Sequence, residues 1–196
     1  MLRLVESIKV QDGVIYNLEH HQERMDRSVY KLTGEKNLIN LSDELTVPVE
    51  YFTGLYKCRV VYRESIELVE FLPYFRREIR SLRIVHADID YSCKYENRSE
   101  LNMLFAQRGE CDDILIIKNG LVTDTSSANI AFTDGKAWFT PAEPLLYGTK
   151  RSRLIAEKKL IERDITAAKI KNFSHASIIN AMIDPGEILI STEFIY

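Results

Sequence analysis

Polar and apolar residues alternate along several short stretches of this 196-residue chain, which is the spacing of a half-buried β-strand. The stretches of this kind are 2–10, 56–63, 65–72 and 79–86. Asn-Gly and Asp-Gly pairs between apolar runs favour tight hairpin turns, because these residues adopt positive φ readily. The pairs in this chain are Asp12-Gly13, Asn119-Gly120 and Asp134-Gly135. The pattern therefore predicts a largely antiparallel sheet.

Other segments repeat their apolar residues at the spacing of an amphipathic helix. One helix is predicted over 18–32, because Gly34 suits the position just past a helix C-terminus. Asn97 and Glu100 have the spacing of a capping box at the start of a second helix. The segment 149–163 is amphipathic and predicts a third helix. Helices mixed with antiparallel strands indicate the α+β fold class.

Composition and charge exclude several classes of function. A formal net charge of −3 provides no positive field for nucleic acid, and no apolar run reaches the length of a membrane span. Cys58, Cys93 and Cys111 are odd in number and form no CxxC pair, so neither a disulfide framework nor a zinc site is expected. His20 and His21 are adjacent on a helix and point in different directions, so no other metal site is expected. The first residues do not resemble a signal peptide, and we expect a cytoplasmic protein without nucleic-acid or membrane partners.

One lysine, Lys94, lies at an expected strand end in DYSCKYENRSELN (90–102), among tyrosines and a cysteine. Burial disfavours the charged form of a lysine, which lowers the pKa of its amine and makes the amine a usable nucleophile and base. The alternative is a surface lysine whose stem packs while its charge stays in water. The lysine by itself favours this second interpretation.

Three further stretches contain residues that could bind a cofactor. Asp124 lies in LVTDTSSANIAF, Arg24 lies in HQERMDRS, and Gly148 precedes an expected helix start in FTPAEPLLYGTKR. The start of a helix can hold an anion through its backbone N–H groups. Taken singly, the three residues have ordinary explanations: a turn aspartate, a solvated helix charge and a loop glycine.

The order and spacing of these stretches resemble the class IV aminotransferase family, the pyridoxal-phosphate enzymes of fold type IV. The matching residues are His21, Arg24, Met25 and Ser28 in a HxxR[LM]xxS pattern, Lys94 with Asn97 and Arg98, Asp112-Asp113, Asn119-Gly120, Asp124 with Asn129, Thr140-Pro141 and Gly148-Thr149-Lys150-Arg151. Together they span about 130 residues in register, a combination that rarely arises by chance.

The resemblance implies two lobes with pyridoxal 5'-phosphate between them. They are a small N-terminal α/β domain at 1–72 and a larger C-terminal α/β domain at 78–196 with the reactive lysine, joined by a linker at 73–77. A homodimer is expected, since members usually pair. Two departures are expected as well: the usual N-terminal hairpin is absent, and Asp124 replaces the usual glutamate, which is longer by one bond of about 1.5 Å.

The resemblance also implies roles at the cofactor. The residues expected to bind it are Arg24, Lys94, Asp124, Asn129, Gly148, Thr149 and Lys150. Lys94 is expected to be the Schiff-base lysine and to move the substrate proton. Asp124 is expected to face the ring nitrogen, so that the ring keeps its proton and withdraws electrons. Arg24 and the backbone amides of 148–150 are expected to bind the phosphate.

The segment NAMIDP (180–185) resembles aminodeoxychorismate lyases more than aminotransferases. Its residues Asn180, Ala181 and Met182 are expected to contact the substrate. Ser7 aligns with a threonine that is proposed to protonate the leaving group in the lyase, and its alternative is a strand serine facing solvent.

Arg59 lies near the arginine that binds the substrate carboxylate in the family, and Arg63 is an alternative on the same strand face. The leading hypothesis is a 4-amino-4-deoxychorismate lyase that releases pyruvate and 4-aminobenzoate, a folate precursor. The alternatives are a class IV aminotransferase of the branched-chain or D-amino-acid type and a non-catalytic relative that binds pyridoxal phosphate.

Overall fold

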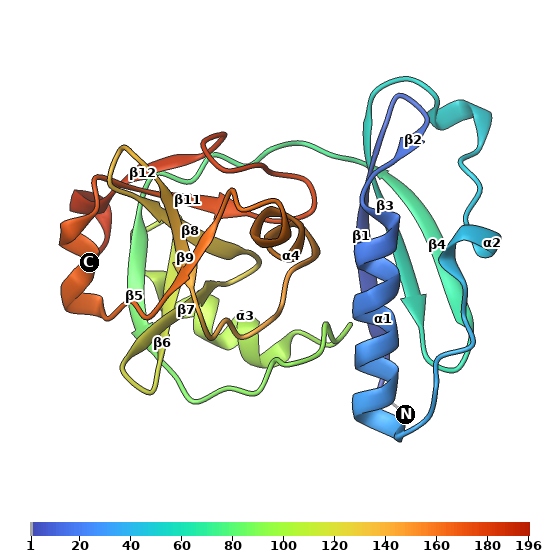
Figure 1. The fold of residues 1–196 in the computed structure, drawn as a ribbon, viewed down its shortest axis with the longest axis horizontal. Coiled ribbons are helices and arrows are strands. Elements are labelled where there is room, and N and C mark those ends of the chain that lie inside the picture. The colour runs from blue at the N-terminus through green and yellow to red at the C-terminus, as the bar shows by residue number, and fades with distance from the viewer. Residues whose placement is uncertain (1) are drawn as a thin grey trace. The chain divides into compact units, whose positions relative to one another are not determined.

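The computed structural model describes residues 2–196, which form two compact units (Figure 1). The first unit comprises the chain up to Arg76 together with Cys93–Asn97, and the second comprises Arg77–Ser92 and Arg98–Tyr196. The expected domain limits remain a proposal, but one detail differs from them. The segment with Lys94 packs in the first unit, whereas the expected C-terminal domain, 78–196, includes it.

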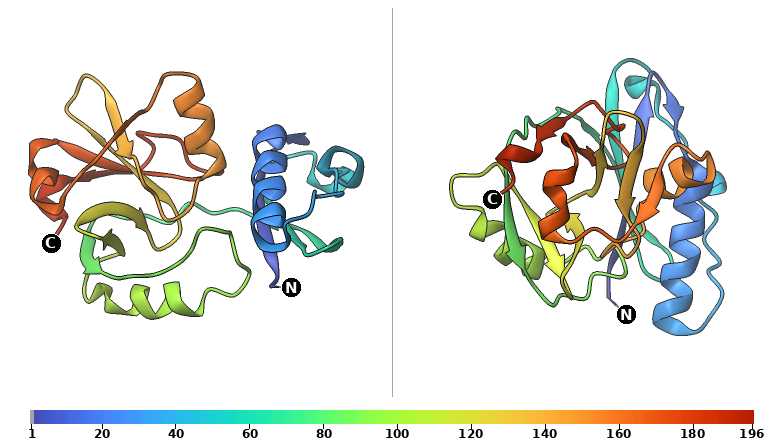
Figure 2. Two further views of the ribbon diagram at one scale, coloured as in Figure 1. Left: turned by 60° about the horizontal axis from the view of Figure 1, so that its bottom comes forward. Right: turned by 60° about the vertical axis from the view of Figure 1, so that its left-hand side comes forward.

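A four-stranded antiparallel sheet in the order β2-β1-β3-β4 forms the first unit. Its strands are β1 (Leu4–Gln11), β2 (Val14–Ile15), β3 (Leu55–Tyr62) and β4 (Ile66–Pro73). The alternation along β1 turns Leu4, Ile8 and Val10 to one face, where they form a buried core with Met25 and Val29. The last two residues belong to α1 (Leu18–Thr33), which lies along this face of the sheet (Figure 2).

Helix α1 ends as predicted, because Gly34 has a φ of 73° and its N–H binds the carbonyl of Tyr30. Two short helices, α2 (Leu41–Glu44) and η1 (Val49–Tyr51), follow α1 before the chain enters β3. The predicted turn at Asp12-Gly13 is confirmed, with both residues at positive φ between β1 and β2.

An eight-stranded mixed sheet forms the second unit, with the path β10-β9-β8-β7-β6-β5 and with β11 beside β8 and β12. Its strands are β5 (Leu82–His86), β6 (Asp113–Lys118), β7 (Leu121–Thr125), β8 (Asn129–Thr133), β9 (Trp138–Pro141), β10 (Ile161–Arg163), β11 (His175–Ile179) and β12 (Leu189–Ser191). Its helices are α3 (Ser99–Phe105), η2 (Ala106–Arg108), α4 (Thr149–Ala156), η3 (Ala167–Asn172) and η4 (Thr192–Phe194). β7 pairs with β8 at one position, Asp124 opposite Asn129.

The α+β class with antiparallel and mixed sheets is confirmed, and so are the two hairpins of the second unit. Asn119 and Gly120 have φ values of 51° and 79° and join β6 to β7. Asp134 and Gly135 lie in the loop between β8 and β9, where the Asp134 carboxylate accepts two backbone N–H bonds.

The predicted helix over 149–163 is wrong in its second half. α4 ends at Ala156, Lys158 has a φ of 58°, and 161–163 form a strand parallel to β9. Leu160 is buried just before β10, whereas all three residues of β10 are exposed, so the apolar spacing that favoured a continuous helix does not mark a buried helical face here. The predicted capping box is wrong too, because α3 has Arg98 at its N-cap without a side-chain hydrogen bond.

Candidate active site

The structure distributes the predicted site residues over both units. The first unit contains Ser7, Arg24, Arg59 and Lys94, and the second contains Asp124, Asn129, Gly148, Thr149, Lys150, Asn180, Ala181 and Met182.

Arg24 is buried on the sheet-facing side of α1, where it contacts Glu6 of β1. Its Nε donates to Glu6 Oε1 at 2.9 Å and its Nη2 donates to Oε2, so the guanidinium pairs with both oxygens. Burial alone would raise the pKa of Glu6, but the Arg24 charge and the His21 contact outweigh it and lower this pKa to about 2. Glu6 therefore stays ionised inside the protein and orients the guanidinium of Arg24.

His21 completes this buried cluster, with its Nδ1 at 2.6 Å from Glu6 Oε2. Burial lowers the pKa of His21, and the positive charges of Arg24 and Lys94 act in the same direction. An ionised carboxylate can only accept, so the neutral imidazole donates its Nδ1 proton to Glu6. The charge of Lys94 is thus close enough to His21 to contribute to the lowering of this pKa.

Glu6 was not among the predicted site residues, although the sequence contains a signal for it. In β1, Leu4, Glu6, Ile8 and Val10 occupy alternate positions, so a carboxylate stands in an otherwise apolar row. A charge at such a position needs a buried partner. That partner is Arg24 of α1, 18 residues further along the chain.

Lys94 is half-buried in an irregular segment that pairs with the start of β1. The N–H of Val5 donates to the carbonyl of Lys94 at 2.9 Å, and the N–H of Glu96 donates to the carbonyl of Arg3 at 2.9 Å. These bonds fix the backbone directly after the lysine, from its own carbonyl to the N–H of Glu96. They also explain why 93–97 packs with the first unit.

Ser7 and Arg59 lie directly opposite each other on β1 and β3, on the sheet face that Glu6 does not share. Arg59 Nη1 donates to Glu70 Oε2 at 2.8 Å, and its Nη2 donates to Glu96 Oε1 at 2.6 Å. The arginine expected to bind a substrate carboxylate is therefore already paired with two carboxylates of the protein.

In the second unit, Asp124 of β7 is buried and hydrogen-bonded through both oxygens. Its Oδ1 accepts from Asn129 Nδ2 at 2.7 Å, and its Oδ2 accepts from the N–H of Leu146 at 2.9 Å. Burial raises the pKa of Asp124 to about 6 even though these hydrogen bonds oppose the shift. A cation beside Asp124 would strongly stabilise the ionised carboxylate. The protonated ring nitrogen of the cofactor is such a cation, and a facing carboxylate is what keeps its proton in place.

Gly148 stands at the N-cap of α4, close to the side chain of Asn129. A Cβ at position 148 would lie 2.0 Å from Asn129 Oδ1, so any larger residue here would force the Asn129 side chain to move. Thr149 and Lys150 follow in the first turn of α4, both buried. The positive end of the helix dipole thus starts beside the Asp124–Asn129 pair, where it suits an anion such as a phosphate.

Lys150 connects α4 to the segment expected to contact the substrate. Its buried Nζ donates to Asp184 Oδ1 at 2.7 Å. Asp184 follows a turn in which Asn180 Oδ1 accepts from the N–H of Met182 at 2.9 Å, and Asn180 pairs with Ile183. Residues 180–182 therefore form a defined turn joined to the start of α4.

Arg151 is fully buried and has a structural role. Its Nη2 donates to the carbonyl of Pro141 at 2.8 Å and to Glu162 Oε1 at 2.7 Å, which connects α4 with β9 and β10. Among the residues 2–196, no group of acidic, histidine and cysteine side chains could hold a metal ion. No helix within that range is long and apolar enough to cross a membrane.

Residues 73–186 match the model of the family amino-transferase class IV, which covers more than half of the chain. The chain therefore belongs to this family. Since its members use pyridoxal phosphate, the expected cofactor is confirmed.

Three proteins are similar to this chain over most of its length. An uncharacterised protein of Haemophilus influenzae is 41% identical over 185 residues, which cover 93% of this chain and 98% of that protein. A crystal structure from Haemophilus somnus 129pt, provisionally named a 4-amino-4-deoxychorismate lyase, is 34% identical with a TM-score of 0.84, and the match covers 93% and 97% of the two chains. The PLP-bound form of a hypothetical aminotransferase from Mycobacterium tuberculosis is 16% identical with a TM-score of 0.77, over 98% of this chain and 81% of that one, which shows a common fold.

Proposed function

We propose that this chain is a pyridoxal-phosphate-dependent lyase that converts 4-amino-4-deoxychorismate to pyruvate and 4-aminobenzoate, a precursor of folate. The observation that carries the proposal is the 34% identity to the Haemophilus somnus protein over 93% of this chain, since that protein is provisionally named for this activity. The NAMIDP segment and Ser7 support the same reaction.

When bound, pyridoxal phosphate supplies an aldehyde that combines with amines and a ring that withdraws electrons. Lys94 provides the amine that holds the cofactor and, once released, moves the proton at the substrate Cα. Asp124, supported by Asn129, keeps a proton on the ring nitrogen. Arg24 and the amides of 148–150 bind the phosphate through charge-assisted hydrogen bonds.

Ser7 and the turn 180–182 act on the substrate in this proposal. The Ser7 hydroxyl donates a proton to the departing enolpyruvyl carbon, while Asn180, Ala181 and Met182 line the substrate. Arg59 binds a substrate carboxylate by giving up Glu70, the more exposed of its two partners.

The decisive experiment measures pyruvate release from 4-amino-4-deoxychorismate by the pure protein loaded with pyridoxal phosphate. Release that disappears in Lys94→Ala supports the proposal. Borohydride reduction followed by peptide mass spectrometry shows independently whether the cofactor is attached at Lys94. A protein that takes up the cofactor at Lys94 but releases no pyruvate above the Lys94→Ala background is not this lyase.

An aminotransferase is the second candidate, because the family model that matches this chain is named for that activity. It predicts that an amino acid alone converts the bound cofactor to pyridoxamine phosphate, which changes the absorbance. A panel of branched-chain L-amino acids and of D-amino acids distinguishes this activity from the lyase. A non-catalytic relative responds to neither kind of substrate.

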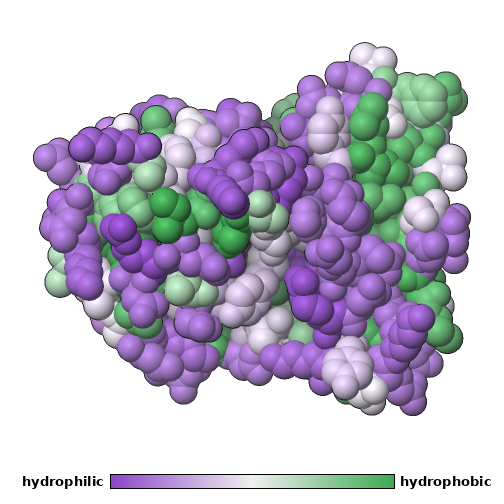
Figure 3. All heavy atoms as spheres, in the orientation of Figure 1, coloured by the Kyte–Doolittle hydropathy of each residue, from purple (hydrophilic) through white to green (hydrophobic). Residues whose placement is uncertain are grey.

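We also propose a homodimer in the cytoplasm. Exposed apolar side chains gather on the first unit, and Figure 3 shows hydrophobic surface over that part of the molecule. They include Val49, Phe52, Leu68, Val69 and Leu72. A surface of this kind is typical of a protein interface. Light scattering of the purified chain tests the dimer directly.

A further inference from the structure

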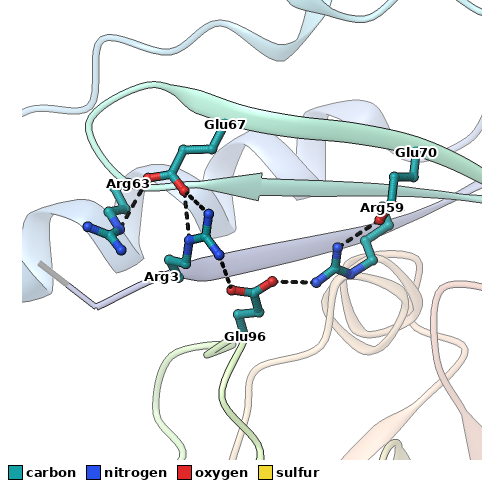
Figure 4. Close-up of polar contacts among 6 residues, drawn as sticks. All are labelled: Arg3, Arg59, Arg63, Glu67, Glu70 and Glu96. Carbon is teal, nitrogen blue, oxygen red and sulfur yellow. Dashed lines mark hydrogen bonds and ion pairs between the residues drawn. The ribbon is translucent and has the colours of Figure 1, made fainter.

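Six charged side chains form a continuous series of ion pairs over one face of the sheet in the first unit (Figure 4). In order they are Arg63, Glu67, Arg3, Glu96, Arg59 and Glu70. The charges alternate and sum to zero. The sheet and the residues next to its strands supply all of the members except Glu96.

Glu96 belongs to the segment 93–97 and lies at the centre of the series. Its Oε2 contacts Arg3 Nη1 at 3.2 Å, and its Oε1 accepts from Arg59 Nη2 at 2.6 Å. About a quarter of the side chain is exposed, 26% for Glu96 and 25% for Arg59, so water screens this contact only in part. Charge-assisted bonds to two different arginines hold one carboxylate better than a single exposed pair does.

Two backbone hydrogen bonds join the same segment to the start of β1, one from Lys94 and one from Glu96. Val5 binds the carbonyl of Lys94, and Arg3 accepts the N–H of Glu96. Because a lysine stem has four rotatable bonds, the backbone position decides which volume its amine can reach. A side chain that fixes this backbone two residues away thus influences the reach of the amine.

We propose that Glu96 is a positioning residue, which holds the backbone of Lys94 in the place its chemistry needs by joining Arg3 and Arg59. This inference rests on the proposed role of Lys94. Arg59 then has two roles: it binds the substrate carboxylate and it holds Glu96 in place.

Glu96→Gln tests the proposal, because the variant keeps the shape of the side chain and removes its charge. Each arginine retains another carboxylate, Glu67 for Arg3 and Glu70 for Arg59, so the variant leaves no unpaired cation and should fold. Glu70→Gln is the matched control, since it removes the other partner of Arg59 and leaves the contact to 93–97 intact.

The first measurement is amide hydrogen exchange of residues 93–97 in the cofactor-free protein. Glu96→Gln is expected to speed exchange there by about tenfold, while Glu70→Gln stays close to the wild type. The second is the rate of cofactor attachment at Lys94, trapped with borohydride and followed over pH. It is expected to fall about tenfold in Glu96→Gln only.

If Glu96→Gln and Glu70→Gln show the same exchange rate at residues 93–97 and the same rate of cofactor attachment at Lys94, the proposal is overturned. A wild type that never attaches the cofactor at Lys94 would overturn the proposed function instead, while the exchange comparison would still report whether Glu96 holds the segment. A third variant, Glu96→Asp, separates charge from length. Trapping that recovers partly in this variant supports positioning by the charge, and trapping as low as in Glu96→Gln argues against it.

Discussion

The side chain of Asn129 fills the space beside the Cα of Gly148, so that a Cβ there would lie 2.0 Å from Asn129 Oδ1. The amide nitrogen of the same asparagine donates to Asp124 at 2.7 Å and to the carbonyl of Leu146 at 2.8 Å. The absence of a side chain at 148 is therefore a condition for the hydrogen bond that Asp124 receives.

Gly148→Ala should lower the free energy of unfolding by about 2–3 kcal/mol, because Asn129 cannot move without losing its hydrogen bonds to Asp124 and to the carbonyl of Leu146. Denaturation in urea measures this loss. The control is the double variant with Asn129→Ala, which removes the clashing atom. In that background the added methyl group should cost less than about 1 kcal/mol, and an unchanged cost would show that the clash is not with Asn129.

Glu6 should make the stability of the protein fall in acid. Its folded pKa is lowered from 4.5 to about 2, so its stabilisation is present above pH 4.5 and is lost as the pH falls through about 2. The loss is on the order of 3 kcal/mol for a buried group with such a shift. Urea denaturation across this range measures it.

Glu6→Gln should lack this acid-dependent loss and should already be less stable at neutral pH, by about 3–5 kcal/mol, since the variant removes the carboxylate charge with which the buried Arg24 pairs. Glu19→Gln, on the exposed side of α1, is the matched control and should behave like the wild type. Parallel curves for the wild type and Glu6→Gln in acid would contradict the assigned state of Glu6.

Arg24→Lys should weaken the uptake of pyridoxal phosphate at least about tenfold, because a lysine cannot pair with Glu6 through two nitrogens and face a phosphate at the same time. Fluorescence titration with the cofactor measures the affinity. Arg27→Lys changes an exposed arginine of the same helix and should leave it unaltered. Equal affinities in the two variants would remove Arg24 from the phosphate site.

Asp124 should make the uptake of the cofactor pH-dependent. With a folded pKa raised from 3.8 to about 6, its contribution to the stability of the ligand-free protein is present below pH 3.8 and is lost as the pH rises through about 6. A cationic ring favours the carboxylate, so the affinity for pyridoxal phosphate should fall below about pH 6, by up to about tenfold per pH unit.

Asp124→Asn should bind the cofactor weakly at every pH and should lack this step. The phosphate of the cofactor titrates near the same pH in both proteins, so the informative quantity is the difference between their two profiles. Superimposable profiles would mean that Asp124 does not face the ring nitrogen.

Turns and helix ends that depend only on neighbouring residues could be predicted from the sequence. The turns at Asp12-Gly13 and Asn119-Gly120 and the end of α1 at Gly34 depend on residues that adopt positive φ, and all three are confirmed. The segment 149–163 was predicted wrongly because its apolar spacing is compatible with a helix throughout, while β9 offers residues 161–163 a parallel strand partner. A partner of that kind is invisible to a local pattern.

By itself, the sequence determined the family, the cofactor and the candidate residues, since the spacing of motifs along a chain can be compared without coordinates. Only the tertiary structure showed that Glu6 holds Arg24, that Asn129 excludes a side chain at 148, and that Glu96 ties the Lys94 segment to Arg3 and Arg59. These contacts join residues separated by 18 to 93 positions. The physical reason is that pairing of charges and exclusion of volume depend on distances in space, which are set when strands and helices pack together.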